Sequence, residues 1–162
     1  MEAEPKGLLG LIVARALWAT QSNAAPQAVE SATRALTEGV ASAPLRELAG
    51  APEDMNVFEL GALIDAVLSS ANVDVSDMTE EEALKLSARH YANCVLQGQM
   101  SVRELAGWAH SRIGHDGPGW AQELVNLDDS FDAFDGGWGH EPNWTQTLGH
   151  FLVASDGLDH KW

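Results

Sequence analysis

Apolar residues recur three or four positions apart along almost the whole chain, and glycines or polar residues separate the apolar stretches. This spacing places apolar side chains on one face of a helix. Long alternation of apolar and polar residues, which is typical of strands, is nearly absent. The pattern therefore predicts an all-α fold with about seven to eight helices. We place them at residues 8–21, 26–38, 44–49, 57–71, 80–97, 102–113, 118–135 and 142–154.

Residues that cap helices stand just before several of these segments. A serine, threonine or asparagine side chain at this position accepts a backbone N–H of the first turn, and a glutamate three residues later completes a capping box. Ser42 is placed to cap the third helix. Capping boxes are predicted at Asn56 with Glu59, Thr79 with Glu82, and Ser101 with Glu104.

The chain has 162 residues, which is close to the size of one ordinary domain. The connections between the predicted helices are short, and short connections favour antiparallel or orthogonal neighbours in a bundle. We therefore predict a single all-helical domain over residues 1–162. Residues 72–78 are the best candidate for a soft internal boundary.

The charge is strongly negative, with 24 acidic and 9 basic residues and a formal net charge of −15. No lysine or arginine lies between Arg112 and Lys161, although this stretch holds nine carboxylates, the last of them Asp159. Such a surface repels nucleic acid and anionic lipid and attracts a basic protein from a distance. The composition therefore favours a basic protein partner and argues against nucleic-acid binding.

The predicted helix at residues 118–135 concentrates this charge. Its apolar face consists of Trp120, Leu124, Leu127, Phe131 and Phe134. Its polar face carries Glu123, Asp128, Asp132 and Asp135, with Asp129 nearby. Aspartate is a poor helix former, and no lysine or arginine three or four positions away neutralises these carboxylates. The face is either an ordinary solvated surface or a surface that binds a basic partner.

A glycine-rich stretch follows this helix and contains Trp138. A tryptophan on an exposed loop is a good interface anchor. The alternative is that Trp138 folds back onto the core. We predict a partner-binding surface formed by Glu123, Asp128, Asp129, Asp132, Asp135, Trp138 and Glu141.

The pair His115–Asp116, with His90 upstream, suggests a different chemistry. Metal-dependent phosphohydrolases of the HD superfamily use a histidine, a His-Asp pair and a later aspartate on helices, where imidazole and carboxylate hold a divalent metal that activates water. Here the pair lies in a glycine-rich turn rather than in an apolar helix. Its simpler interpretation is a helix C-terminus with a favourable histidine, followed by an aspartate in a turn.

No other pattern indicates an enzyme, and we predict neither a cofactor nor a metal. Cys94 is the only cysteine, which excludes an intramolecular disulfide and favours a small core residue. No stretch approaches 18 apolar residues, and the N-terminal segment lacks the basic start of a secretory signal. The expected location is the bacterial cytoplasm. The oligomeric state stays open.

Two stretches carry a resemblance, namely Trp108-Ala109-His110 through Gly114-His115-Asp116-Gly117, and Leu127-Asp128-Asp129-Ser130-Phe131-Asp132. They resemble a pattern in small, uncharacterised helical proteins of bacteria, some of which belong with the immunity proteins of polymorphic toxin systems. The resemblance implies a non-enzymatic inhibitor that blocks a basic toxin, such as a nuclease. The alternatives are an HD-like phosphohydrolase, a DNA mimic and an adaptor protein.

Overall fold

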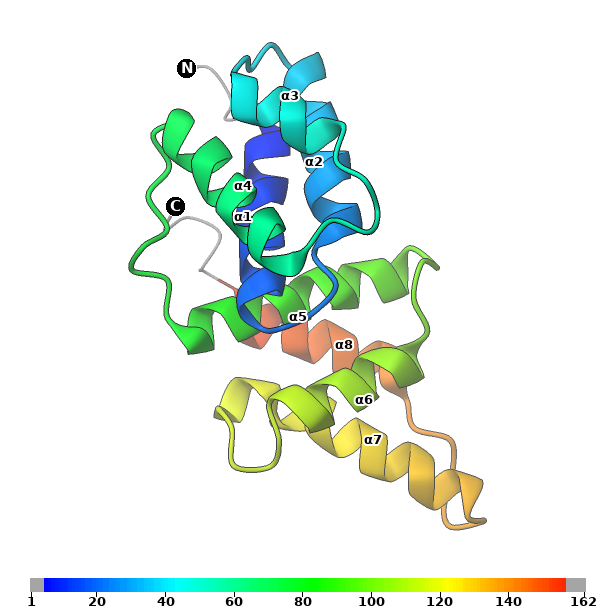
Figure 1. The fold of residues 1–162 in the computed structure, drawn as a ribbon. Helices are drawn as coiled ribbons and strands as arrows, with labels where there is room; N and C mark the ends of the chain where they lie inside the picture. The colour runs from blue at the N-terminus through cyan, green and yellow to red at the C-terminus, as the bar shows by residue number, and fades with distance from the viewer. Residues whose placement is uncertain (1–4, 157–162) are drawn as a thin grey trace. The chain divides into compact units, whose positions relative to one another are not determined.

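The computed structural model describes residues 5–156, and within this range it is all-α, as predicted (Figure 1). No helix in residues 5–156 combines the length and apolar character that crossing a bilayer requires. The described helices are α1 (Lys6–Ala19), α2 (Ala25–Thr37), α3 (Ala43–Ala49), α4 (Val57–Ser70), α5 (Glu80–Leu96), α6 (Val102–Arg112), the 3₁₀ helix η1 (Gly119–Ala121), α7 (Gln122–Asp135) and α8 (Trp144–Ala154).

Local signals explain where these helices begin. The four predicted cap residues each accept a backbone N–H of the following turn: Ser42 from Leu45 at 3.2 Å, Asn56 from Phe58 at 2.8 Å, Thr79 from Glu82 at 3.1 Å and Ser101 from Glu104 at 3.1 Å. These bonds satisfy N–H groups that have no partner within the helix.

Several predicted boundaries differ from the observed ones by one or more residues, and two of these differences have a clear local cause. The helix expected from Pro118 begins as the 3₁₀ helix η1 and becomes regular at Gln122. The last helix begins at Trp144 rather than Pro142, because the Asn143 side chain accepts the N–H of Gln146 at 3.3 Å and so acts as the cap.

The chain divides into two compact units, one up to Ala83 and one from Leu84 onward. The division falls shortly after the predicted boundary loop at residues 72–78. The prediction of one domain over residues 1–162 stays a prediction.

In the first unit α1 packs against α2 and α4, and α3 packs against α2 and α4. The contact between α1 and α2 is close because small residues meet there: a Cβ on Gly7 would stand 2.4 Å from the backbone nitrogen of Ala35. The Glu38 carboxylate accepts the N–H groups of Lys6 at 3.0 Å and Gly7 at 2.7 Å, which caps the start of α1. These hydrogen bonds lower the pKa of Glu38.

In the second unit α5, α6, α7 and α8 surround a core of alanine, leucine, valine and phenylalanine side chains. Phe151 of α8 is 1% exposed, and its ring centroid lies 6.0 Å from that of Trp120. The buried members of this core are Ala88, Ala92, Val95, Leu105, Ala109, Leu124, Val125, Leu148 and Phe151.

Candidate functional site

The acidic helix α7 packs against α6, and two side-chain pairs define how the helices align. Arg103 near the start of α6 pairs with Asp135 at the end of α7. His110 near the end of α6 meets Asp128 in the middle of α7, with Nδ1 and Oδ2 2.8 Å apart. An earlier residue of α6 pairs with a later residue of α7, so the two helices are antiparallel.

The pairing with α6 corrects one premise of the sequence interpretation. Within α7 no basic residue neutralises the aspartates, but α6 supplies the Arg103 guanidinium to Asp135 and the His110 imidazole as a hydrogen-bond partner to Asp128. The turn between the helices supplies a third group, because His115 Nε2 lies 2.9 Å from Asp129 Oδ2. Asp135 is therefore compensated by a cation of a neighbouring helix, and Asp128 and Asp129 have imidazole partners outside α7, which single-helix spacing cannot reveal.

At the C-terminal end of α7 the negative charge of the carboxylates is only partly compensated by basic side chains. The Arg103 guanidinium donates two hydrogen bonds to Asp135, and the negative fields of Glu141 and Asp132 also act on it; together these groups raise the pKa of Arg103 further above its ordinary value. The charges of three carboxylates thus act on one guanidinium, which donates its hydrogen bonds to Asp135. The C-terminal end of a helix is also the negative end of its dipole, where acidic residues are unfavourable.

Arg103 should give the protein a pH-dependent increment of stability. Its hydrogen bonds lower the pKa of Asp135 below the ordinary value of 3.8. Stability from a lowered carboxyl pKa is fully present above the unfolded-state pKa and is lost as the pH falls through the folded-state pKa. Arg103→Met should therefore reduce the free energy of unfolding near neutral pH, and the difference from the wild type should shrink below about pH 4.

Urea unfolding across this pH range measures the effect. Arg46→Met is the control, since Arg46 is exposed on α3 and has no ion pair within the described chain. Cζ of Arg103 also lies 4.7 Å from the centroid of the Phe131 ring. If the stability lost in Arg103→Met did not change with pH, this ring contact would contribute more than the ion pair with Asp135.

The predicted partner-binding residues do not all lie on one surface. Asp128, Asp132 and Asp135 follow spacings of four and three, so they share the side of α7 that faces α6. Glu123 lies about half a helical turn away from Asp132. Its carboxylate approaches His150 of α8, with Oε1 and Nδ1 3.8 Å apart. Glu123 therefore belongs to a different side of the second unit.

Trp138 is exposed rather than folded onto the core, with 77% of its surface accessible. The loop turns sharply because Gly137 and Gly139 have φ values of +87° and +74°, which non-glycine residues rarely adopt. The Trp138 N–H donates to the carbonyl of Ala133 at 2.9 Å, which anchors the loop to the end of α7. The indole is thus presented three residues after Asp135.

The turn that carries His115 is held by glycines and by one amide. Gly114 has a φ of +76°, and a Cβ on Gly117 would stand 2.5 Å from the Ile113 side chain. The side-chain amide of Gln122 donates to the carbonyls of Gly114, Gly117 and Pro118 at 3.1, 3.2 and 3.3 Å. These restraints fix the path of the turn between α6 and α7.

The structure does not assemble the residues expected for an HD-like centre. The group of potential metal ligands in the described chain consists of His110, His115 and Asp129, whose ligand atoms all lie within 4.8 Å of one another. His90 instead lies on α5, where its Nε2 is 3.6 Å from Sγ of Cys94. His115 was predictable from the sequence as a candidate ligand but its neighbour His110 was not, because the two histidines come together only when the glycine turn folds back.

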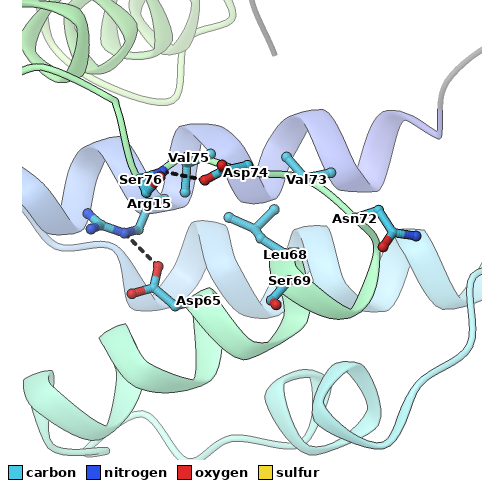
Figure 2. A pocket seen from close by; sticks show the side chains of 9 residues that line it. All are labelled: Arg15, Asp65, Leu68, Ser69, Asn72, Val73, Asp74, Val75 and Ser76. Atoms are coloured by element: carbon cyan, nitrogen blue, oxygen red, sulfur yellow. Dashed lines mark hydrogen bonds and ion pairs between the residues drawn. The ribbon is translucent and has the colours of Figure 1, made fainter.

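A hollow in the first unit lies between α1, the end of α4 and the loop that follows α4 (Figure 2). Arg15 Nε donates to Asp65 Oδ1 at 2.7 Å, so this guanidinium is already paired. The Asp74 carboxylate accepts hydrogen bonds from the hydroxyl and N–H of Ser76, which lower its pKa. The sequence analysis did not identify this hollow, whose lining residues are Arg15, Asp65, Leu68, Ser69, Asn72, Val73, Asp74, Val75 and Ser76.

Comparisons with protein-family models, curated proteins and solved structures find no match to this chain.

Proposed function

We propose that this chain is a non-enzymatic inhibitor that binds a basic bacterial protein, in the manner of an immunity protein and its toxin. The observation that carries the proposal is a group of exposed carboxylates, Asp132 and Asp135 in the last turn of α7 and Glu141 in the loop that follows, all of which act on Arg103. Trp138 stands beside this group in the sequence and is exposed. We place this inhibitor in the bacterial cytoplasm.

The position of these charges supports a binding role. Asp132 and Asp135 lie in the last turn of α7, where the helix dipole disfavours them, and aspartate is a poor helix former at any position. A surface that served solubility alone would usually mix charges of both signs. Residues that break a local rule are expected first at functional or strained sites.

Recognition of the partner would combine two kinds of interaction, charge pairing and an apolar contact. The carboxylates of the α7 end would attract and then pair with lysines and arginines of the partner, and charge-assisted hydrogen bonds of this kind are among the strongest. The Trp138 indole would enter an apolar pocket of the partner as an anchor. In a nuclease toxin the blocked cations would be those that hold the phosphates of the substrate.

Association kinetics with the partner test the proposal. The partner is obtained by affinity capture with the tagged chain from a bacterial lysate, and its rate of association is then measured by stopped-flow fluorescence. Asp132→Asn combined with Glu141→Gln should slow association roughly tenfold at low ionic strength, because steering depends on net surface charge. Added salt should slow the wild type more than this variant.

The matched control is Glu53→Gln combined with Asp54→Asn, which removes the same charge from exposed positions of the first unit. The control should associate at nearly the wild-type rate. Equal slowing by both pairs would show a net-charge effect without a local surface. An association rate that does not respond to salt would refute electrostatic recognition. A captured partner that is acidic would do so as well. If the captured partner binds nucleic acid and has no toxic activity that the chain inhibits, the DNA-mimic alternative is favoured.

A further inference from the structure

We propose that His110, His115 and Asp129 form a binding site for a divalent transition metal, foremost Zn²⁺. The site goes beyond the proposed inhibitor function and is tested with the metal alone, so either proposal can fail without the other. Imidazole suits zinc and its neighbours in the first transition row, and carboxylate oxygen is also a zinc ligand. The three residues come from the end of α6, the glycine turn and the middle of α7.

The separations between the ligand atoms of His110, His115 and Asp129 are close to those between the ligands of a bound zinc ion. Ligand atoms at about 2.0–2.1 Å from a tetrahedral zinc stand about 3.3 Å apart. His115 Nε2 and Asp129 Oδ2 are 2.9 Å apart, and the whole set lies within 4.8 Å. Closing the widest separation requires a movement of up to about 1.5 Å. Rotation of the His115 and Asp129 side chains accommodates it, because both are about half exposed.

Asp128 prepares His110 for this role. Its Oδ2 lies 2.8 Å from His110 Nδ1, and the neutral imidazole that donates a hydrogen bond from Nδ1 has its lone pair on Nε2, ready for the metal. A carboxylate behind a metal-bound histidine fixes the ring orientation and makes the ligand nitrogen more basic. Asp128 is the more buried of the two adjacent aspartates, with 25% of its side chain exposed against 50% for Asp129. The adjacent aspartates Asp128 and Asp129 thus have different roles, one as orienting group and one as ligand.

The scaffold is organised before any ion binds. The His110 and His115 rings meet edge to face with centroids 5.1 Å apart. Gln122 holds the turn of His115 through its three carbonyl contacts, and packing of α6 on α7 holds His110 near Asp129. Binding would then replace the contact between His115 and Asp129 by two bonds to the ion. Three protein ligands leave at least one coordination position for water or for a side chain of a partner.

Isothermal titration calorimetry of the full chain with ZnCl₂, after dialysis against a chelator, tests the site. The wild type should bind one Zn²⁺ per chain. Asp128→Asn should weaken binding by about 10- to 100-fold, as expected for a group that orients a ligand, and His115→Ala should weaken it at least as much. His150→Ala is the matched control, because His150 is an exposed histidine of α8 outside this cluster, and it should bind as the wild type does.

Far-UV circular dichroism establishes that each variant is folded. Imidazole ¹⁵N shifts of the wild type provide a second readout that needs no variant: Zn²⁺ should shift the ring nitrogens of His110 and His115 and leave those of His150 unchanged. The proposal is overturned if the wild type does not bind Zn²⁺. It is equally overturned if His115→Ala binds as the wild type does, or if the shifts appear at His150 instead.

Discussion

Phe151→Ala should reduce the free energy of unfolding by about 3–5 kcal/mol, the usual range for removing a buried phenylalanine. Phe151 is 1% exposed and contacts the core of the second unit, including the Trp120 ring. The loss has two parts, since burial of the ring is forfeited and the surrounding side chains close the resulting cavity only partly. Urea unfolding followed by circular dichroism measures the change.

Val153→Ala is the control on the same helix. Val153 is 80% exposed, so its truncation should change stability by no more than about 0.5 kcal/mol. If Phe151→Ala lowered the free energy of unfolding as little as Val153→Ala, α8 would not pack on this core through Phe151.

Gly7→Ala should cost about 2 kcal/mol or more, although alanine is normally the better helix residue. The added Cβ would stand 2.4 Å from the nitrogen and 2.6 Å from the Cα of Ala35. These are backbone atoms, which cannot rotate away, so α1 and α2 must separate. The same unfolding measurement applies.

Gly149→Ala should instead increase the free energy of unfolding. Gly149 is exposed within α8, and a Cβ there meets nothing within 4 Å, so the exchange should gain about 0.5–1 kcal/mol from helix propensity. Stabilisation by both substitutions would show that α1 and α2 are not in close contact at Gly7.

Most of the fold was predictable because its signals are local. Ser42, Asn56, Thr79 and Ser101 act as caps within three residues of their own positions, and the apolar spacing gave every helix. The fold class is confirmed. Helix boundaries were less predictable: the Asn143 cap was missed, and so was the irregular start at η1, since a 3₁₀ turn and the first turn of an α-helix have similar sequences.

The candidate site was predictable only in part because its contacts are not local. Asp128 and Asp135 were recognised as acidic, but their partners His110 and Arg103 lie on another helix and depend on the antiparallel alignment. A usable signal existed in the sequence. Two histidines that flank a glycine, followed by adjacent aspartates on the next helix, would have pointed to His110 beside His115.

The contact between α1 and α2 and the core around Phe151 differ in the size of the side chains that meet there, and this difference affects how each can change over time. Where α1 meets α2, Gly7 and Ala35 leave no free volume, so almost any larger residue is excluded. Around Phe151, large side chains can be exchanged for others of similar volume with a smaller effect. Divergence should therefore be slower where α1 meets α2 at Gly7 and Ala35 than in the core around Phe151.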